Sequence, residues 1–260
     1  MSMVTATTTE HLTDCRLRAD RWRLRDAAAC IRPSSMFEVP LDAPSGTPVP
    51  FGVVPLALGT VTGEYWRRRL DGLGPEEQVP AFHRSERVRV TYGDAVACIG
   101  DTVEITSTVE GRTLTSVVRS PAGKVAEVEQ LLSQAAVVAE AAVGQPTTGP
   151  LRSPAEQLTR VRVARWAYVG GEHLSVHGNH VAAIRAGLPA AVLPVSLLVG
   201  IAERLLFPDN SPLGGLCIEV LRPVYAGDSF ATEETPMQSD RRTGPTMVTD
   251  RGATIRTWLT

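Results

Sequence analysis

Hydrophobic positions follow two different periods along this chain, and each period predicts a different kind of element. Within residues 53–70 the apolar positions are spaced to line one face of a helix: Leu56, Leu58, Val61, Tyr65 and Leu70. Gly59 and Gly63 weaken this helix prediction, because glycine costs helix stability. Alternating apolar and polar positions then follow, with turn residues at Glu110-Gly111 and Ala122-Gly123, over residues 84–90, 102–108, 112–119 and 125–132. This succession predicts an apolar helix followed by an antiparallel meander.

A similar pattern begins again after residues 144–154, whose three prolines are typical of a linker. Residues 158–165 alternate as a strand, and residues 166–180 indicate a helix or turn that leads into a loop. A long apolar helix is predicted over residues 188–207. Further strands are predicted over 216–220 and 229–235, with one or two more within 246–259.

Weaker signals surround these elements. The polar, arginine-rich residues 1–35 contain a helical piece around residues 20–31. Residues 40–50, with four prolines, and residues 72–80 are predicted to be loops. Residues 135–142 are predicted to extend a strand or to form a short helix.

The two halves share a skeleton. In each, an apolar helix leads to a strand and then to a Gly-Asp pair, in Cys98-Ile-Gly-Asp101 and in Tyr225-Ala-Gly-Asp228, followed by an alternating strand. Repetition in register favours an internal duplication over two unrelated turn dipeptides. A half of this kind can bury its helix by curling its sheet around it, and two halves can hide two sheet edges by pairing them.

Composition narrows the class of protein. The 260 residues are 43% hydrophobic and 21% charged, with a formal net charge of −2. This balance excludes disordered, collagen-like and coiled-coil chains and disfavours a nonspecific nucleic-acid binder. Only Lys124 among the 26 basic residues is a lysine, a bias that indicates a GC-rich bacterial genome.

Cysteine spacing and hydropathy indicate the compartment. Cys15, Cys30, Cys98 and Cys217 form no CxxC pair, so we expect neither a zinc site nor a disulfide framework. Apolar runs stay shorter than a membrane span, and the N-terminus lacks the features of a secretory signal. We therefore expect a cytoplasmic protein with reduced cysteines and no membrane partner.

Three stretches of the second half carry a resemblance to a known family: Gly171-Glu172-His173-Leu174-Ser175-Val176-His177, Gly187 to Val195, and Leu221-Arg-Pro-Val-Tyr-Ala-Gly-Asp228. They resemble the MaoC-like (R)-specific enoyl hydratases and 3-hydroxyacyl dehydratases, in which an acid and a histidine five positions on lie beside a buried helix. The motif is altered here. Glu172 replaces the usual Asp, Leu174 and Ser175 replace Asn and Pro, and Pro194-Val195 replaces His-Gly.

The resemblance implies an α+β double hotdog, in which two antiparallel sheets each wrap a long central helix and join into one continuous sheet. The division would be a degenerate first half with an N-terminal extension over residues 1–143, a linker over 144–154, and a second half over 155–260. Homodimers are common among hotdog folds, although a double-hotdog chain can supply the paired sheet alone.

The resemblance also implies an enzyme that adds or removes water at the α,β position of an acyl thioester carried by CoA or an acyl carrier protein. Glu172 would be the acid/base and His177 its partner. Backbone N–H groups near Val195 and Ser196 would bind the thioester oxygen, and Leu174 would make the pocket drier. No metal or cofactor is implied.

Alternatives remain at this point. One is an enzyme of polyketide-like biosynthesis that dehydrates or cyclises its substrate. Another is a non-catalytic acyl-binding or partner subunit, with Glu172 a solvated loop residue and His177 a satisfied polar residue. Glu172 and His177 pointing into one tunnel would favour an enzyme, whereas a tunnel filled by Leu174 and Trp166 would favour the subunit. A metal face on His173, His177 and His180 is disfavoured because no carboxylate has matching spacing.

Overall fold

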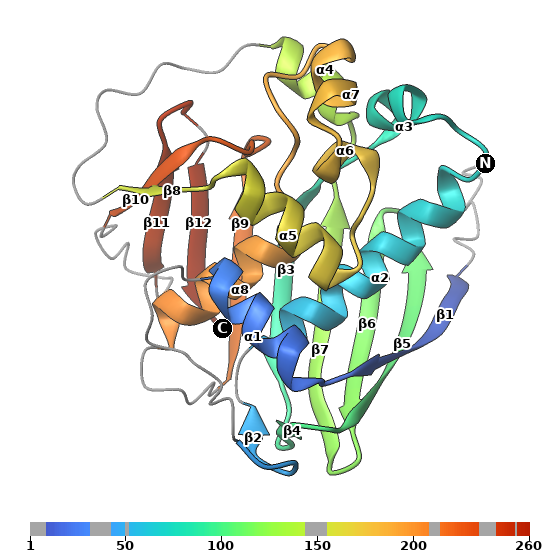
Figure 1. Ribbon diagram of the computed structural model, residues 1–260, viewed down its shortest axis with the longest axis vertical. Helices are drawn as coiled ribbons and strands as arrows, with labels where there is room; N and C mark the ends of the chain where they lie inside the picture. The colour runs from blue at the N-terminus through green and yellow to red at the C-terminus, as the bar shows by residue number, and fades with distance from the viewer. Residues whose placement is uncertain are drawn as a thin grey trace, which may run out of the picture.

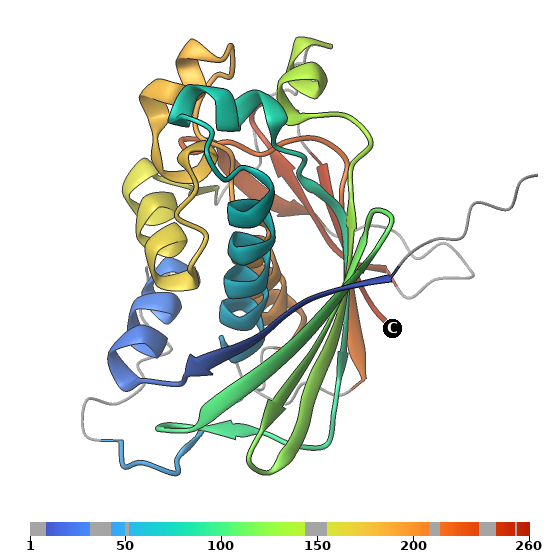
Figure 2. The ribbon, with the colours of Figure 1, turned by 90° about the vertical axis from the view of Figure 1, so that its right-hand side faces the viewer.

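A ten-stranded antiparallel sheet curves around two central helices, and two further helices cover these from the other side (Figures 1 and 2). The computed structural model describes residues 9–31, 43–49, 52–143, 155–207, 214–233, 243–252 and 254–260. The predicted linker at 144–154 lies outside these ranges. Within them, every helix is too short or too polar to cross a lipid bilayer.

The first half supplies five strands of the large sheet and its first central helix. Its elements are β1 (Thr9–Arg18), α1 (Arg21–Ile31), α2 (Val53–Arg69), α3 (Pro75–Ala81), β3 (Ser85–Tyr92), β5 (Thr102–Glu110), β6 (Thr113–Ser120), β7 (Gly123–Leu132) and α4 (Val137–Ala142). A separate small ladder pairs β2 (Pro48–Val49) with β4 (Ala97–Cys98).

The second half has a similar order with shorter strands, and its short helices lie before the central helix rather than after it. Its elements are β8 (Glu156–Gln157), α5 (Arg160–Gly170), α6 (Ser175–Gly178), α7 (His180–Arg185), α8 (Val195–Leu206), β9 (Gly215–Val220), β10 (Ser229–Glu233), β11 (Thr243–Thr249) and β12 (Thr254–Leu259). The predicted helix at 53–70, the four strands of the first meander and the later strands are confirmed, and residues 246–259 contribute to two strands.

The strand order is symmetric about the centre of the sheet. It runs β1-β5-β6-β7-β3-β9-β12-β11-β10-β8, so β3 and β9 join the halves, with Val88 opposite Ile218. Figure 2 shows α2 and α8 between the sheet and an outer layer that contains α1 and α5. The predicted arrangement, a sheet around a helix in each half and one continuous sheet, is confirmed.

The two Gly-Asp turns are built alike. Cys98 N–H donates to Asp101 Oδ2 at 2.8 Å, and Tyr225 N–H donates to Asp228 Oδ2 at 3.0 Å. Each preceding glycine has a positive φ, +92° at Gly100 and +103° at Gly227, which favours glycine. Their N–H groups donate to the carbonyls of Ala19 and Leu158, respectively. Ala19 precedes α1 as Leu158 precedes α5, so β1 and α1 hold the same place in the first half as β8 and α5 in the second.

Two sequence predictions in the second half are wrong. Residues 158–165 are not a strand but lead into α5, because Thr159 Oγ1 accepts from Arg162 N–H and caps the helix. The central helix begins at Val195 and not near residue 188, since Pro194 disfavours helical backbone before it. Leu193 N–H instead donates to Val224 O, and Val192 pairs with Tyr225 in an isolated antiparallel bridge, so this segment is extended.

The first half also departs from prediction at two places. Strand β1 was not predicted. Residues 75–81, within the predicted loop, form α3: Pro75 suits its first position, and Glu77 Oε2 accepts from Gly74 N–H at 2.8 Å.

The glycines of α2 allow the second half to approach closely. A Cβ at Gly63 would lie 2.1 Å from Gly171 O, and one at Gly59 would lie 2.8 Å from Gly170 O. Real Cβ atoms do not approach carbonyl oxygens so closely. The two residues that weaken the helix in sequence therefore bring the end of α5 against α2.

Candidate active site

Glu172 is fully buried just after α5. Gly171 ends the helix with a left-handed φ of +84°, which turns the chain inward at this point. Ser196 Oγ on α8 donates to Glu172 Oε2 and in turn accepts from Trp166 Nε1 at 2.8 Å. Residues of α8 and α5 thus hold one oxygen of the carboxyl group in place, Ser196 directly and Trp166 through Ser196.

His177 lies on the short helix α6 and is also buried. Its Nδ1 is 2.8 Å from the carbonyl oxygen of Val192. A carbonyl can only accept, so Nδ1 carries the proton and Nε2 presents a lone pair. The Phe82 ring packs edge-on against the imidazole, with 5.2 Å between centroids.

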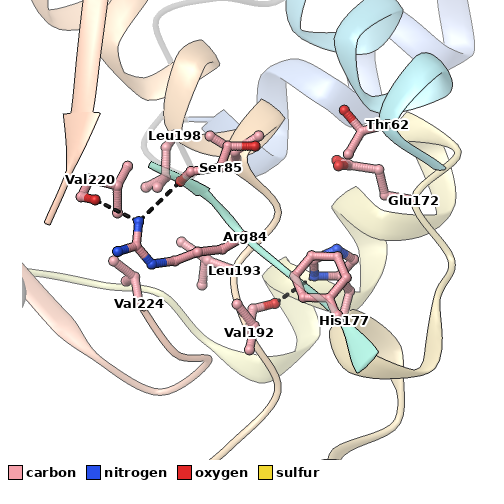
Figure 3. Close-up of a pocket in the computed structure, with 12 residues that line it drawn as sticks. Thr62, Arg84, Ser85, Glu172, His177, Val192, Leu193, Leu198, Val220 and Val224 are labelled. Atoms are coloured by element: carbon pink, nitrogen blue, oxygen red, sulfur yellow. Dashed lines mark hydrogen bonds between the residues drawn. The ribbon is translucent and has the colours of Figure 1, made fainter. Parts of the chain in front are cut away.

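Glu172 and His177 line the same cavity, as expected if the chain is an enzyme (Figure 3). Among the described residues, neither Glu172 Oε1 nor His177 Nε2 has a hydrogen-bond partner, although both are buried. The cavity volume is about 20 Å³, which is room for about one water molecule. The remaining wall is mainly apolar, formed by Phe82, Val192, Leu193, Val195, Leu198, Val220 and Val224.

Burial shifts the two titrating groups in opposite directions. It raises the pKa of Glu172 to about 8, an effect that the hydrogen bond from Ser196 partly offsets. It lowers the pKa of His177 to about 4, against the opposing effect of the hydrogen bond to Val192. Desolvation penalises the charged form of each group, so at neutral pH the pair is a neutral acid beside a neutral base.

The other predicted site residues are placed differently. Val195 is the first residue of α8 and lines the cavity, and the N–H groups of Val195 and Ser196 have no intrahelical acceptor. The Ser196 side chain contacts Glu172 and does not line the cavity. Leu174 caps α6 and does not line it either. Trp166 is buried behind Ser196, so neither Leu174 nor Trp166 fills this space.

The first half contributes lining residues that the sequence reasoning did not identify: Thr62, Phe82, Arg84 and Ser85. Contacts between the halves bring them to the site, at the join of β3 and β9 and where α2 packs against α5 and α8, so no local motif signals them. The Arg84 guanidinium donates to Glu140 Oε2 at 2.7 Å, to Val220 O at 2.6 Å and to Leu221 O at 3.1 Å. Arg84 therefore ties the halves together across the join.

Metal binding finds no support in the part of the chain that the structure describes, where no three His, Cys, Asp or Glu side chains cluster to hold an ion. His173 is exposed, and the Nδ1 atom of His177 is directed at a carbonyl. Cys15, Cys30, Cys98 and Cys217 carry free thiols.

Sequence comparison identifies no relatives: no family model matches the chain, and no curated protein matches it. Solved structures do match. HtdX of Mycobacterium tuberculosis superposes with a TM-score of 0.62 at 15% identity, over 97% of this chain and 100% of that one. A MaoC-like dehydratase from Phytophthora capsici gives 0.59 at 13% identity, over 99% and 96%.

A third match is the peroxisomal multifunctional enzyme type 2 of Drosophila melanogaster. Its TM-score is 0.57 at 13% identity, over 95% of this chain and 48% of that chain. At these identities the likeness shows the fold. The double-hotdog architecture, shared with the MaoC-like dehydratase, is thereby confirmed.

Proposed function

We propose that this chain is a MaoC-like hydro-lyase that removes water from, or adds it to, the α,β position of an acyl thioester. One observation carries the proposal: Glu172 Oε1 and His177 Nε2 are buried, lack partners among the described residues and face one cavity. Buried polar atoms are normally hydrogen-bonded, and exceptions of this kind gather at catalytic sites.

The protonation states assign the roles in the dehydration direction. His177 Nε2, with its lone pair free, takes the α-proton of a 3-hydroxyacyl thioester. Glu172, protonated on Oε1, donates its proton to the β-hydroxyl group, which leaves as water. The α,β double bond forms from the electron pair of the broken C–H bond. Addition of water reverses each step, with the Glu172 carboxylate as the base and the His177 imidazolium as the proton donor.

The thioester oxygen gains negative charge as the α-proton leaves. The N–H groups in the first turn of α8, at Val195 and Ser196, point from a helix N-terminus whose dipole favours an anion. Pro194 has no N–H group, so the donors must come from the residues after it. This supports the expected oxyanion site at Val195 and Ser196, with the Ser196 side chain holding Glu172 at the same time.

The acyl carrier is CoA or an acyl carrier protein in this proposal, and the apolar wall suits the acyl chain. The water-sized space of about 20 Å³ suits the reacting β-hydroxyl, which the proposal places against Glu172 and His177.

The test is to mix the protein with an (R)-3-hydroxyacyl-CoA and follow the enoyl absorbance. Glu172→Gln and His177→Ala should each abolish the signal or reduce it by about 100-fold or more, the usual contribution of general acid–base catalysis. Glu203→Gln is a matched control, because Glu203 is equally buried but contacts Tyr92 and Gly52. Equal rates in the wild type and the two site variants would refute the hydro-lyase proposal.

A further inference from the structure

A chain of buried polar side chains reaches the cavity from the first half. Thr62 Oγ1 on α2 is 3.1 Å from Gln130 Oε1 on β7, and Gln130 Nε2 is hydrogen-bonded to Ser85 Oγ on β3. Gln130 is fully buried, and Thr62 and Ser85 are nearly so. Burying an amide in a sheet core costs free energy unless its hydrogen bonds are made, so the burial of Gln130 and its partners needs an explanation.

Backbone irregularity directs Ser85 inward. Along β3, Val90 and Val88 face the core, and strict alternation would place Glu86 there next. The pairing with β7 instead shifts between Ser85 and Arg87, so the two strands are out of step by one residue. This bulge turns Ser85 into the buried face and into the cavity wall. Bulges of this kind commonly re-aim a side chain beside an active site.

The hydroxyl group of Ser85 has hydrogen-bonding capacity that no described residue uses. Its hydroxyl group accepts from Gln130, and no described residue accepts its proton. Turning the Gln130 amide by half a turn exchanges donor and acceptor. Ser85 would then donate to Gln130 and keep its lone pairs free. Ser85 therefore keeps an unused hydrogen-bonding function in both orientations: its O–H donor in the first and its lone pairs in the second. A hydroxyl group on a ligand can both donate and accept, so it can pair with Ser85 in either case.

The other polar groups of the cavity wall already have hydrogen-bond partners or a role in the proposed reaction. Arg84 donates to Glu140 and to backbone carbonyls, and Thr62 lies within 2.8 Å of Leu58 O as well as near Gln130. Glu172 and His177 serve the proposed reaction. Figure 3 shows these two on one side of the cavity and Ser85 on the other, towards Val220 and Val224.

We propose that Ser85, oriented by Gln130, is a specificity residue that binds a hydroxyl group on the acyl chain, beyond the reacting α and β carbons. The inference rests on the proposed function, because it takes the acyl thioester as the ligand. The substrate class it names is a hydroxylated acyl thioester, with apolar carbons against Leu193 and Leu198 and the hydroxyl at Ser85.

The experiment compares trans-2-hexenoyl-CoA with its analogues that carry a hydroxyl at C4, C5 or C6. Hydration rates give kcat/KM, and calorimetry gives Kd, for the wild type, Ser85→Ala and Gln130→Leu. In the wild type we expect one analogue to be preferred about tenfold over the plain chain, the effect of one good hydrogen bond. Both variants should lose that preference. Ser107→Ala is the matched control, since Ser107 is a buried serine that pairs with Ser116 outside the cavity.

The outcomes separate the two proposals. Turnover with no preference for any hydroxylated analogue, or a preference that Ser85→Ala retains, would overturn the role of Ser85 and leave the hydro-lyase intact. Hydroxyl-dependent binding without turnover, lost in Ser85→Ala, would support the subsite and overturn the hydro-lyase. A preference that Ser107→Ala reduces as much as Ser85→Ala would also count against the subsite.

Discussion

Ser196 on α8 donates a hydrogen bond to Oε2 of Glu172, which leaves Oε1 as the oxygen of that carboxyl group without a partner among the described residues. The bond has two effects. It fixes the direction of the carboxyl group, and it lowers a pKa that burial would otherwise raise further. Trp166 Nε1 in turn orients the hydroxyl of Ser196. The proton donation proposed for Glu172 therefore depends on a residue that does not line the cavity.

Replacing Ser196 with alanine should shift the pH dependence of catalysis. Loss of the hydrogen bond removes an interaction that lowers the pKa of Glu172, so the pKa should rise above about 8. The dehydration rate, which needs protonated Glu172, should then persist to higher pH, with a maximum about tenfold lower because the carboxyl is less well oriented. The pH profile of kcat/KM measures both effects. A profile whose alkaline limb stays near pH 8, as in the wild type, would contradict the role given to Ser196.

Under the proposed hydro-lyase activity, the wild-type protein should give a bell-shaped pH profile for dehydration. His177 must be neutral, so the rate should rise with pH through about 4. Glu172 must be protonated, so the rate should fall through about 8. In Glu172→Gln the alkaline limb should disappear from the residual activity. An undiminished wild-type rate well above pH 8 would show that Glu172 is not the acid.

Glu203 should make folding stability depend on pH. It is buried on α8, accepts from Tyr92 OH at 2.7 Å, and has a pKa raised from 4.5 to about 8 by burial. The folded state then holds a proton that the unfolded state loses, so stability falls as pH rises from about 4.5 to about 8. Thermal melting across this window should show a smaller fall for Glu203→Gln than for the wild type. Parallel curves would argue against a protonated Glu203.

Gly63→Ala should disturb the site through the backbone. The new Cβ would meet Gly171 O, which belongs to the turn that places Glu172. We expect a loss of about 1–3 kcal/mol in the free energy of unfolding, typical of overpacking, and a fall in activity larger than the loss of folded protein explains. Gly74→Ala is the control, since its Cβ would lie at an ordinary 3.5 Å from Glu77. Equal stability of the two variants would contradict the packing described.

Much of the fold is readable from the sequence because its strands alternate over long, uninterrupted stretches. In the first meander each strand buries one face, and glycine turns at Gly111 and Gly123 join successive strands, so the alternation predicts a sheet. The Gly-Asp turns can also be predicted from the sequence, because each needs a positive φ that favours glycine.

Elements fixed by tertiary contacts are harder to read. Residues 158–165 alternate well enough for a strand, and their helical state depends on the cap at Thr159 and on packing against α1 and α2. The sequence does not predict strand β1, which becomes evident only from its pairing with β5 in the structure. Glu172 and His177 come from one local motif, whereas Ser85 and Thr62 reach the cavity through the join of the halves and a bulge.

The start of α2 differs from the matching start of α8 in the other half. Gly52 N–H, at the N-terminus of α2, is 3.4 Å from the carboxyl group of Glu203, whereas the matching end of α8 borders the cavity. One helix N-terminus thus contacts an acid of the protein itself, whereas the other borders the cavity of the proposed site. Under the proposed function we therefore expect each molecule to bind one acyl group rather than two.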